Sequence, residues 1–551
     1  MPTRVWLSVV ALVVGVGLLA AAGLAGTANP KGGALAGTAA KKGGTLRIGR
    51  PRDVGSVDPA LGYDFDSWMI QFATCAKLYN YPDKAAPEGA NVIPEVATGF
   101  PKVSRDGKTN TIRLRDTYRF HTGARITAAN FVAAFNRDAN PKLESPATTF
   151  LHEIVGADAV IGDNAQTISG VRALGRYALE LRTTRPLPDL VSRLTMPFFC
   201  PIATSTPLRE IDNPLGSGPY YVASRIPNRE VVLERNRFYR GRRPANVDRA
   251  VWTMGVLAGA CREAVERNEL DYCGGTGIPS ADNAEVAARY GINKKGGQFF
   301  FSATPNTDRF TFNHDRPAFK GVGQIPLKQA INWAIDRPAL VRASGFLGGR
   351  RTDQILPPGM GRDASIYPLG GVTERSLAKA RALFAKAKSR PKRLVLYASN
   401  LGGDRARIFQ YNLKRLGIDV DIQYFAIDAL AQKVATRGEP FDVALVGWSI
   451  DYPDPAVFFS WLNGNSIRPT GNTNFGYFDR PKYNRAIERI GRLPVEVRRG
   501  AWANLDLEMT RDDPPYAAYM NPSRRDFISK SFGCYVFHPA YMLDVAAACK
   551  K

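Results

Sequence analysis

Residues 447–455 combine an indole, a carboxylate and two prolines directly after an apolar run. The run at residues 441–446 predicts a strand, and open α/β sheets present their functional groups at the carboxyl ends of strands. Asp451 follows Trp448 by three residues, and a carboxylate beside an aromatic ring suits a cationic group of a ligand. The two prolines restrict the backbone that leads away from this carboxylate. The motif therefore predicts a ligand-binding site; the competing interpretation is a proline-rich surface loop.

Serine hydrolysis is the chemistry that would make the chain an enzyme. Ser217 and Ser523 are the candidate nucleophiles of such a secreted hydrolase. Neither lies in a Gly-x-Ser-x-Gly elbow or a Ser-x-x-Lys dyad, and no histidine has a persuasive orienting partner in the sequence. We therefore expect no catalytic residues and no enzymatic activity.

The cysteines favour disulfides over a metal site. No pair has the two-to-four-residue spacing of a zinc site, and the four histidines are scattered, so we expect neither a metal nor a cofactor. Sequence alone does not fix the connectivity, but two of the pairings close short loops and leave the third pair over. The predicted disulfides are Cys261 with Cys273, Cys534 with Cys549, and Cys75 with Cys200.

The N-terminus has the pattern of an export signal. Arg4 precedes an almost wholly apolar run at residues 5–24, and small residues follow up to position 28. We expect residues 29–43 to be a flexible tether and the remainder to be periplasmic or at the cell surface. About 20 apolar residues are also just sufficient to span a bilayer, so an uncleaved N-terminal anchor is the alternative.

Length and charge limit the number of domains and the kinds of partner that the rest of the chain can have. About 500 residues remain after the export segment, which is enough for two or more domains with proper cores. The formal net charge is +24, but the lysines and arginines are spread along the chain without a long basic run. We therefore predict a basic, solvated surface and no nucleic-acid partner; a basic adhesion protein for wall polymers is a third functional class.

Hydrophobic periodicity indicates a mixed α/β protein. The section at 393–424 reads strand–helix–strand, which is a βαβ unit. The predicted strands are residues 45–49, 110–114, 177–181, 220–223, 231–235, 393–399, 419–424, 441–446 and 516–519. The predicted helices are residues 67–78, 127–135, 325–335, 374–388, 404–416, 427–437 and 495–511.

Several short blocks, taken in order, resemble a known family over nearly all of residues 43–551. No single block is decisive, whereas their ordered occurrence is highly specific. The blocks are residues 43–49, 56–60, 68–81, 93–97, 106–109, 120–123, 215–220, 234–241, 312–313, 328–337 and 448–455. In this order they resemble the extracellular solute-binding proteins of the peptide and nickel class, the binding components of ABC importers.

The resemblance implies a two-lobed α/β fold of the periplasmic-binding-protein type, in the large class II form with an extra subdomain. Two crossing strands would form a hinge on which the lobes close. Mapped onto this chain, lobe I would comprise residues 44–300 and 512–551, with the subdomain inserted at 63–189. Lobe II would comprise residues 301–511.

The resemblance also implies a function and its residues. The protein would capture short peptides and deliver them to an ABC permease, as a monomer. Asp451 would receive the ammonium of the peptide. Other ligands in the same family would be a nickel chelate, an oligosaccharide or an opine-like molecule.

Further positions are expected to contact the ligand. Trp448 and Tyr452 would cover it, and the backbone of Gly447 would bond to an extended peptide as a neighbouring strand does. Tyr63 and Trp68 would lie at the mouth of the cleft. The competing structural interpretations are that these aromatic side chains belong to the core, and that Asp451 caps a helix beginning near Pro455.

Overall fold

The structure is a computed structural model that describes residues 41–273 and 277–551. The predicted export segment and its alternative as a membrane anchor, residues 1–28, lie outside the described residues. Within the described part of the chain, no helix is both long and apolar enough to cross a membrane.

The first sheet has five strands in the order β11-β1-β10-β9-β8. Strand β1 pairs in parallel with β10 and β11, and β9 pairs antiparallel with β8 and β10. Helix α5 (Ala258–Glu266) connects β10 to β11, which makes a parallel crossover that the sequence analysis does not predict. The strands are β1 (Thr45–Gly49), β8 (Tyr220–Ile226), β9 (Glu230–Arg235), β10 (Arg249–Thr253) and β11 (Tyr272–Cys273).

The second sheet has seven strands in the order β12-β18-β13-β17-β15-β16, and β14 pairs with β18. The predicted βαβ unit is confirmed, because β15 and β16 are parallel neighbours joined by α10 (Gly403–Lys414). The strands are β12 (Phe299–Ala303), β13 (Asn306–Phe312), β14 (Gly349–Arg351), β15 (Arg393–Ser399), β16 (Asp419–Phe425), β17 (Val443–Ser449) and β18 (Tyr516–Phe527).

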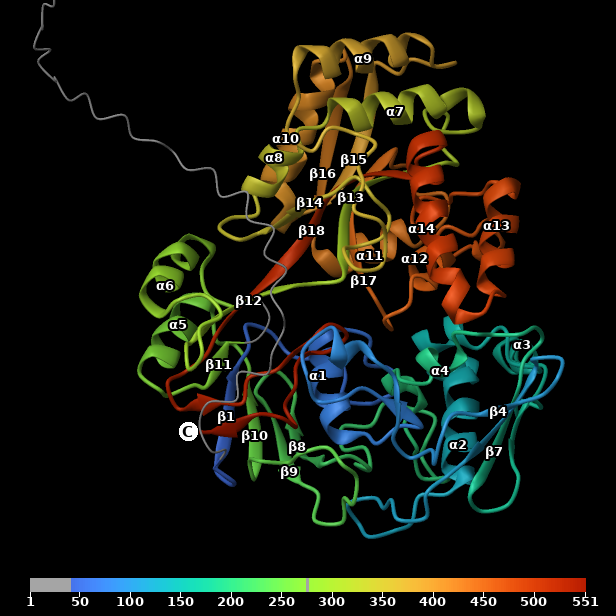
Figure 1. Ribbon diagram of the computed structural model, residues 1–551, viewed down its shortest axis with the longest axis vertical. Helices are drawn as coiled ribbons and strands as arrows, with labels where there is room; N and C mark the ends of the chain where they lie inside the picture. Colours follow the sequence, from blue (N-terminus) through green and yellow to red (C-terminus); the bar gives the residue numbers. More distant parts are fainter. Residues whose placement is uncertain (1–40, 274–276) are drawn as a thin grey trace, which may run out of the picture. The chain divides into compact units, whose positions relative to one another are not determined.

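Helices α7 (Ile325–Ala334), α9 (Glu374–Ala385) and α10 lie beside the second sheet (Figure 1). Leu327 of α7, Leu377 of α9 and Phe409 of α10 share one buried cluster with Phe310 and Leu396 of the sheet. Burial of these side chains removes apolar surface from water and is the main favourable contribution to this layer.

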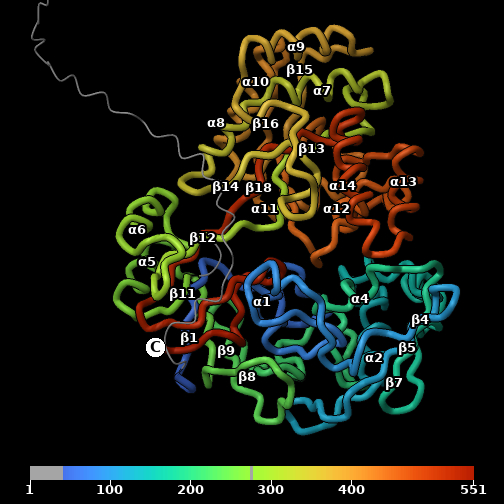
Figure 2. Tube along the Cα trace, in the orientation of Figure 1, coloured from blue at the N-terminus to red at the C-terminus, as the bar shows by residue number. Residues whose placement is uncertain are grey.

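Two chain segments run between the two sheets (Figure 1). One is β12 followed by β13, and the other is β18, which pairs with β13 in its first half and with β12 in its second. Beyond β18, Ile528 forms a bridge to Tyr272 of the first sheet. The C-terminal tail then lies along the first sheet, where Lys550 bridges Lys41 (Figure 2).

A separate four-stranded sheet has the order β4-β5-β7-β6 and packs against α2 (Ala128–Ala139). Thr127 begins α2 with a capping box, as the sequence predicts for the start of this helix. The strands are β4 (Lys102–Val103), β5 (Thr109–Arg113), β6 (Val171–Ala173) and β7 (Ala178–Arg182). The remaining longer helices are α1 (Phe65–Thr74), α6 (Asn283–Tyr290), α8 (Arg337–Arg342), α11 (Ile427–Val434), α12 (Ala456–Ser460), α13 (Pro481–Gly491) and α14 (Val495–Asp512).

Many predicted elements have different bounds in the structure, and three of these differences have a clear physical reason. Helix α1 begins earlier than residue 67 because Asp64 caps it by accepting from the backbone N–H groups of Asp66 and Ser67. Strand β17 continues to Ser449 because its pairing with β13 continues that far. Strand β18 has 12 residues rather than four, since it pairs with three other strands in succession.

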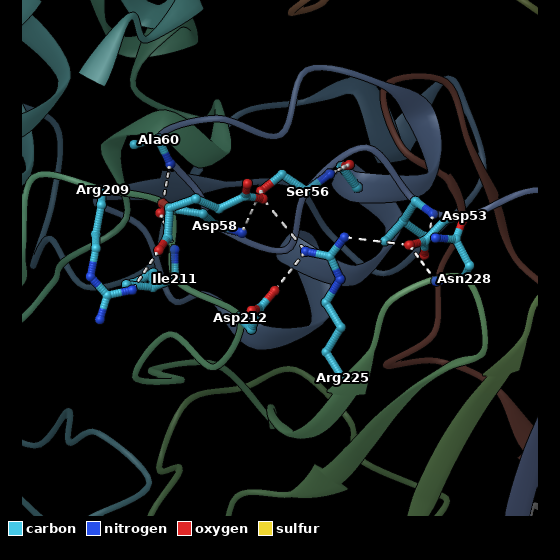
Figure 3. A network of polar contacts seen from close by, with 12 residues as sticks. Asp53, Ser56, Asp58, Ala60, Arg209, Ile211, Asp212, Arg225 and Asn228 are labelled. Carbon is cyan, nitrogen blue, oxygen red and sulfur yellow. Dashed lines mark hydrogen bonds and ion pairs between the residues drawn. The ribbon is translucent and has the colours of Figure 1, made fainter. Parts of the chain in front are cut away.

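A polar network fixes the loop before Tyr63 (Figure 3). The Asp58 carboxylate accepts from the N–H groups of Ala60 and Ile211, and a bidentate ion pair joins it to the buried Arg137 at 2.8 and 2.6 Å. On the other side, Arg225 pairs with Asp212 at 3.0 Å. Buried carboxylates with this many donors hold the backbone in one place.

The predicted disulfide pairing is confirmed. Cys75 pairs with Cys200, which closes a loop with a sequence separation of 125 residues. Cys261 pairs with Cys273 and Cys534 with Cys549, with separations of 12 and 15 residues. The long loop contains the four-stranded sheet, so this bond ties that sheet to the end of α1.

Replacing both Cys75 and Cys200 by alanine is expected to lower the melting temperature more than removal of either other disulfide. Cross-links over longer loops restrict the unfolded chain more, by about 5 kcal/mol for a loop of this length against about 3 kcal/mol for the short ones. Calorimetry of the three double variants measures the difference. Equal or reversed effects would contradict the expectation.

Candidate functional site

The motif at residues 447–455 begins inside the second sheet, because β17 continues to Ser449. This strand pairs with β13 over its whole length, and Trp448 lies opposite Thr307. On its other edge, β15 pairs only with Val443 and Ala444. Among the described residues, the edge of β17 from residue 445 to 449 therefore has no strand neighbour, and its backbone groups are available to another extended chain.

Gly447 is exposed in this strand, opposite Asp308 of β13. A Cβ at position 447 would meet the carboxylate of Asp308. A glycine here therefore leaves space both for Asp308 and for a chain that approaches the free edge.

Asp451 is a buried carboxylate without a cationic partner. Its side chain is 5% exposed, and its Oδ1 accepts a hydrogen bond of 2.8 Å from the hydroxyl of Tyr63. Its Oδ2 is buried and has no hydrogen-bond partner among the described residues. Burial raises the pKa of Asp451 from 3.8 to about 7, and the bond from Tyr63 opposes this rise.

Aromatic rings surround this carboxylate. Tyr63 lies 6.4 Å from Trp448 and 5.4 Å from Phe198, measured between ring centroids. Trp448 is half-buried and also packs against Trp461 and Phe475, at 5.0 and 5.1 Å. Trp448 thus packs in the core through Trp461 and Phe475, as the structural interpretation expects, and it also lies beside Tyr63 near Asp451. Ligand contact by Trp448 stays a prediction.

The carboxylate that bonds to the start of the helix after Pro455 is Asp454, not Asp451. Helix α12 begins at Ala456, and Asp454 accepts from the backbone N–H of that residue at 2.9 Å. Asp454 also forms a buried ion pair with Arg498. Asp451 accepts no backbone hydrogen bond in the structure, so it makes no contribution to this cap.

Tyr452 and Trp68 already have partners. The hydroxyl of Tyr452 donates to Asp189 at 2.8 Å, and Asp189 pairs with Arg193 at 2.9 Å. The indole of Trp68 donates to the carbonyl of Gly62 at 2.9 Å, and the ring is 4% exposed. Ligand contact by these two aromatic residues stays a prediction.

The sequence analysis does not identify three polar residues beside the motif. Asn306 lies opposite Ser449 in the ladder, and both have a buried side-chain oxygen without a partner among the described residues. Asp308 contacts Arg405 at 3.4 Å, and burial raises the pKa of Asp308. Asn306 and Asp308 lie in β13, which the sequence does not predict as a strand, and Ser449 lies at the end of β17, beyond the predicted bound of that strand.

The candidate serines lack the surroundings of a nucleophile. Ser217 is buried and accepts a hydrogen bond from the N–H of Ala76, and no histidine of the described residues bonds to it or to Ser523. Those histidines bond instead to Asp158 and to backbone groups of residues 89, 216, 515 and 540. In the same residues, no three His, Cys, Asp or Glu side chains are grouped so as to hold a metal ion.

Comparison with known proteins gives consistent similarities. Residues 91–469 match the model of the bacterial extracellular solute-binding proteins, family 5 Middle. The probable D,D-dipeptide-binding periplasmic protein DdpA of Escherichia coli is 22% identical over 509 residues, covering 90% of this chain and 92% of that protein.

Two solved structures show the similarity of fold. The clavulanic acid biosynthesis oligopeptide binding protein 2 has a TM-score of 0.83 at 23% identity and covers 93% of this chain and 96% of that one. Haemophilus influenzae OppA, in complex with RPPGFSPFR, has a TM-score of 0.72 at 18% identity and covers 93% of this chain and 100% of that one. The fold is therefore the two-lobed α/β fold of the periplasmic binding proteins, as predicted.

The Asp451→Asn substitution is expected to stabilise the ligand-free protein at pH 8. The pKa of Asp451 is higher in the folded chain than in the unfolded chain, so the folded state binds more protons between pH 4 and 7, and stability falls as pH rises through this range. Asparagine cannot ionise, so the variant avoids this loss, which is about 2–4 kcal/mol. Melting curves from pH 5 to 8 should diverge toward high pH.

Asp506 is the matched control for this experiment. Burial also raises its pKa to about 7, but it accepts from the N–H groups of Ile355 and Leu356 and from the hydroxyl of Thr510. The Asp506→Asn variant places an amide against those donors and should be destabilised. Destabilisation by Asp451→Asn at pH 8 would mean that Asp451 has a structural role instead.

Proposed function

Because this chain belongs to the bacterial extracellular solute-binding proteins, family 5, we propose that it captures short peptides outside the cytoplasm and delivers them to an ABC permease. Relatives whose names specify dipeptides or oligopeptides support the peptide as ligand. A nickel chelate, an oligosaccharide or an opine-like molecule is the alternative that the experiment below distinguishes.

The observation that carries the proposal is the missing partner of Asp451. A buried carboxylate with one free oxygen is costly to keep ionised, and an α-ammonium supplies both the opposite charge and N–H donors. Asp451 thus selects a ligand with a cationic end. The Tyr63 hydroxyl holds the other oxygen and orients the carboxylate.

The free edge of β17 suits the backbone of the peptide. An extended peptide that adds beside residues 445–449 would gain main-chain hydrogen bonds whatever its side chains are. Gly447 leaves room for that approach, and Trp448, Tyr452 and Trp68 are proposed to enclose the ligand. Asn306 and Ser449 have unused polar oxygens at the same end of the ladder.

We propose that the first sheet belongs to lobe I and most of the second sheet to lobe II. Lobe I would comprise residues 44–300 and 512–551 with the subdomain at 63–189, and lobe II residues 301–511. Tyr63 would then belong to one lobe and Asp451 to the other, so their hydrogen bond forms when the lobes close. The segments β12–β13 and β18 are the proposed hinge.

The remaining proposals concern location and assembly. Residues 1–28 would direct export, and residues 29–43 would tether the domain, which acts as a monomer. Binding alone would be the activity: no serine–histidine hydrogen bond within the described residues favours hydrolysis.

Affinity for a short peptide with a free N-terminus is expected to be highest between about pH 7 and 8. Below pH 7 the proton on Asp451 must leave before the ammonium binds, so affinity should fall by up to about tenfold per pH unit. Above pH 8 the ligand's own α-amino group loses its charge. Isothermal titration calorimetry of an alanine tripeptide from pH 5 to 9 measures this profile.

Two variants and one modified ligand complete the experiment. Asp451→Asn should flatten the acid limb and weaken binding at least tenfold at pH 7.5, whereas Asp428→Asn, at an exposed carboxylate, should match the wild type. N-acetylation of the tripeptide should have the effect of Asp451→Asn. Tight binding of the acetylated peptide by the wild type would refute the ammonium contact, and binding of a sugar or chelate alone would refute the peptide as ligand.

A further inference from the structure

Arg309 is a buried cation that lacks an anion. It lies in the central strand β13 and is 4% exposed. Its Nη1 donates to the carbonyl of Thr307 at 3.2 Å, and its guanidinium lies 4.8 Å from the ring centroid of Tyr516. Its Nε is buried without a partner, and no carboxylate of the described residues forms a salt bridge with it.

The adjacent Asp308 forms no ion pair with this guanidinium, although its charge favours the charged form of Arg309. Successive side chains of a strand point to opposite faces. The ladder between β13 and β18 shifts register between Asp308 and Arg309, with the extra residue in β18, but the ladder between β13 and β17 is regular, so these two side chains lie on different faces of the sheet. Asp308 contacts Arg405 and Tyr519 instead. A buried, unpaired guanidinium is costly, and removal of solvent lowers the pKa of Arg309.

A small cavity adjoins the guanidinium. Thr311, two residues along the same face of β13, also lines it, and its buried hydroxyl has no partner among the described residues. The side chain of Asn474 lines it too but is already bonded to the N–H and carbonyl of Phe478. None of the residues that line the cavity is acidic. A cation and a free hydroxyl thus meet in a space without negative charge.

We propose that Arg309 and Thr311 bind one small monovalent anion in this cavity. The guanidinium supplies charge and N–H donors, and the hydroxyl supplies a further donor, which together replace the hydration of a halide or a carboxylate group. Two sources offer this chemistry: a free anion such as chloride, and a carboxylate that belongs to a bound ligand.

The cavity is connected to the candidate peptide site by direct packing. Trp461 and Phe475 line it, and both rings pack against Trp448. Arg309 lies opposite Val446, two residues before Trp448 on the same face of the ladder. An anion bound beside Arg309 would therefore lie in a cavity whose walls include the two rings that pack against Trp448.

The experiment measures the melting temperature of the ligand-free protein in sodium chloride against sodium gluconate at equal ionic strength. Gluconate is too large for the cavity, so the comparison isolates specific binding from screening. The expected result is a chloride-dependent rise of about 1 °C or more that saturates with concentration. A rise that is absent, or equal in both salts, would overturn the proposal.

Three variants locate the effect. Arg309→Met and Thr311→Val replace each side chain by an uncharged or apolar one of similar size. Arg309→Met should abolish the chloride response. Thr311→Val should weaken it at least threefold. Arg309→Met should also be as stable as the wild type without chloride, because it removes an unpaired buried charge. Arg351→Met, at an exposed arginine of the second sheet, should retain the full response. If Arg309→Met does not fold, Thr311→Val still tests the site.

Competition distinguishes the two sources of the anion. If the ligand's carboxylate occupies the cavity, chloride should weaken tripeptide binding, and C-terminal amidation should weaken it in the wild type but not in Arg309→Met. If a free anion occupies the cavity, neither chloride nor C-terminal amidation should weaken tripeptide binding, and the chloride-dependent rise in melting temperature should remain. The melting experiment contains no peptide, so it can succeed even where the proposed peptide function fails.

Discussion

The double pairing of strand β13 is the constraint on which the candidate sites depend. Its neighbours β17 and β18 hold it on both edges, so each of its side chains is assigned to one face of the second sheet. One face receives Arg309 and Thr311 together with Trp448 of β17, and the other receives Asp308 with Gly447. A slip of one residue would exchange the two sets, and the burial of both faces prevents it.

Asp451 and Arg309 are two buried charges of this region without a salt bridge among the described residues. Among the described residues, Lys77, Asp138 and Arg337 are also buried without a salt bridge, whereas many other buried ions have partners: Arg137 has Asp58, Arg498 has Asp454, and Arg193 has Asp189 and Glu153. Asp451 and Arg309 have none. Where a buried ion also keeps an unused polar atom, as Asp451 and Arg309 do, its own contacts do not explain the charge, and an apolar residue of similar size is often as stable there or more stable. A position that keeps its charge at this cost is a candidate for binding the opposite charge.

The sequence predicts the fold well where patterns are local. The βαβ unit at β15–α10–β16 follows from periodicity, and the three disulfides follow from short spacings and the remaining pair. The strands β12 and β13 are missed, because an aromatic cluster such as Phe299 to Phe301 has no distinctive alternation. The full length of β18 is missed as well, since its second half is set by partners more than 200 residues away in the chain. For the same reason, Arg309 could not be recognised from sequence as an unpaired cation.

The contact between Tyr63 and Asp451 has a further consequence for closure. A neutral hydroxyl satisfies one oxygen of the carboxylate but leaves its charge uncompensated, so the arrangement with this bond formed is disfavoured without a cation. A ligand shifts a conformational equilibrium only by its difference in affinity for the two states. An ammonium at Asp451 has that difference, because it meets the desolvated carboxylate only when Tyr63 and the surrounding rings exclude water. In the proposed two-lobe arrangement, the same buried charge would weaken closure of the empty protein and strengthen closure around a cationic ligand, and a single protonation at Asp451 would diminish both effects.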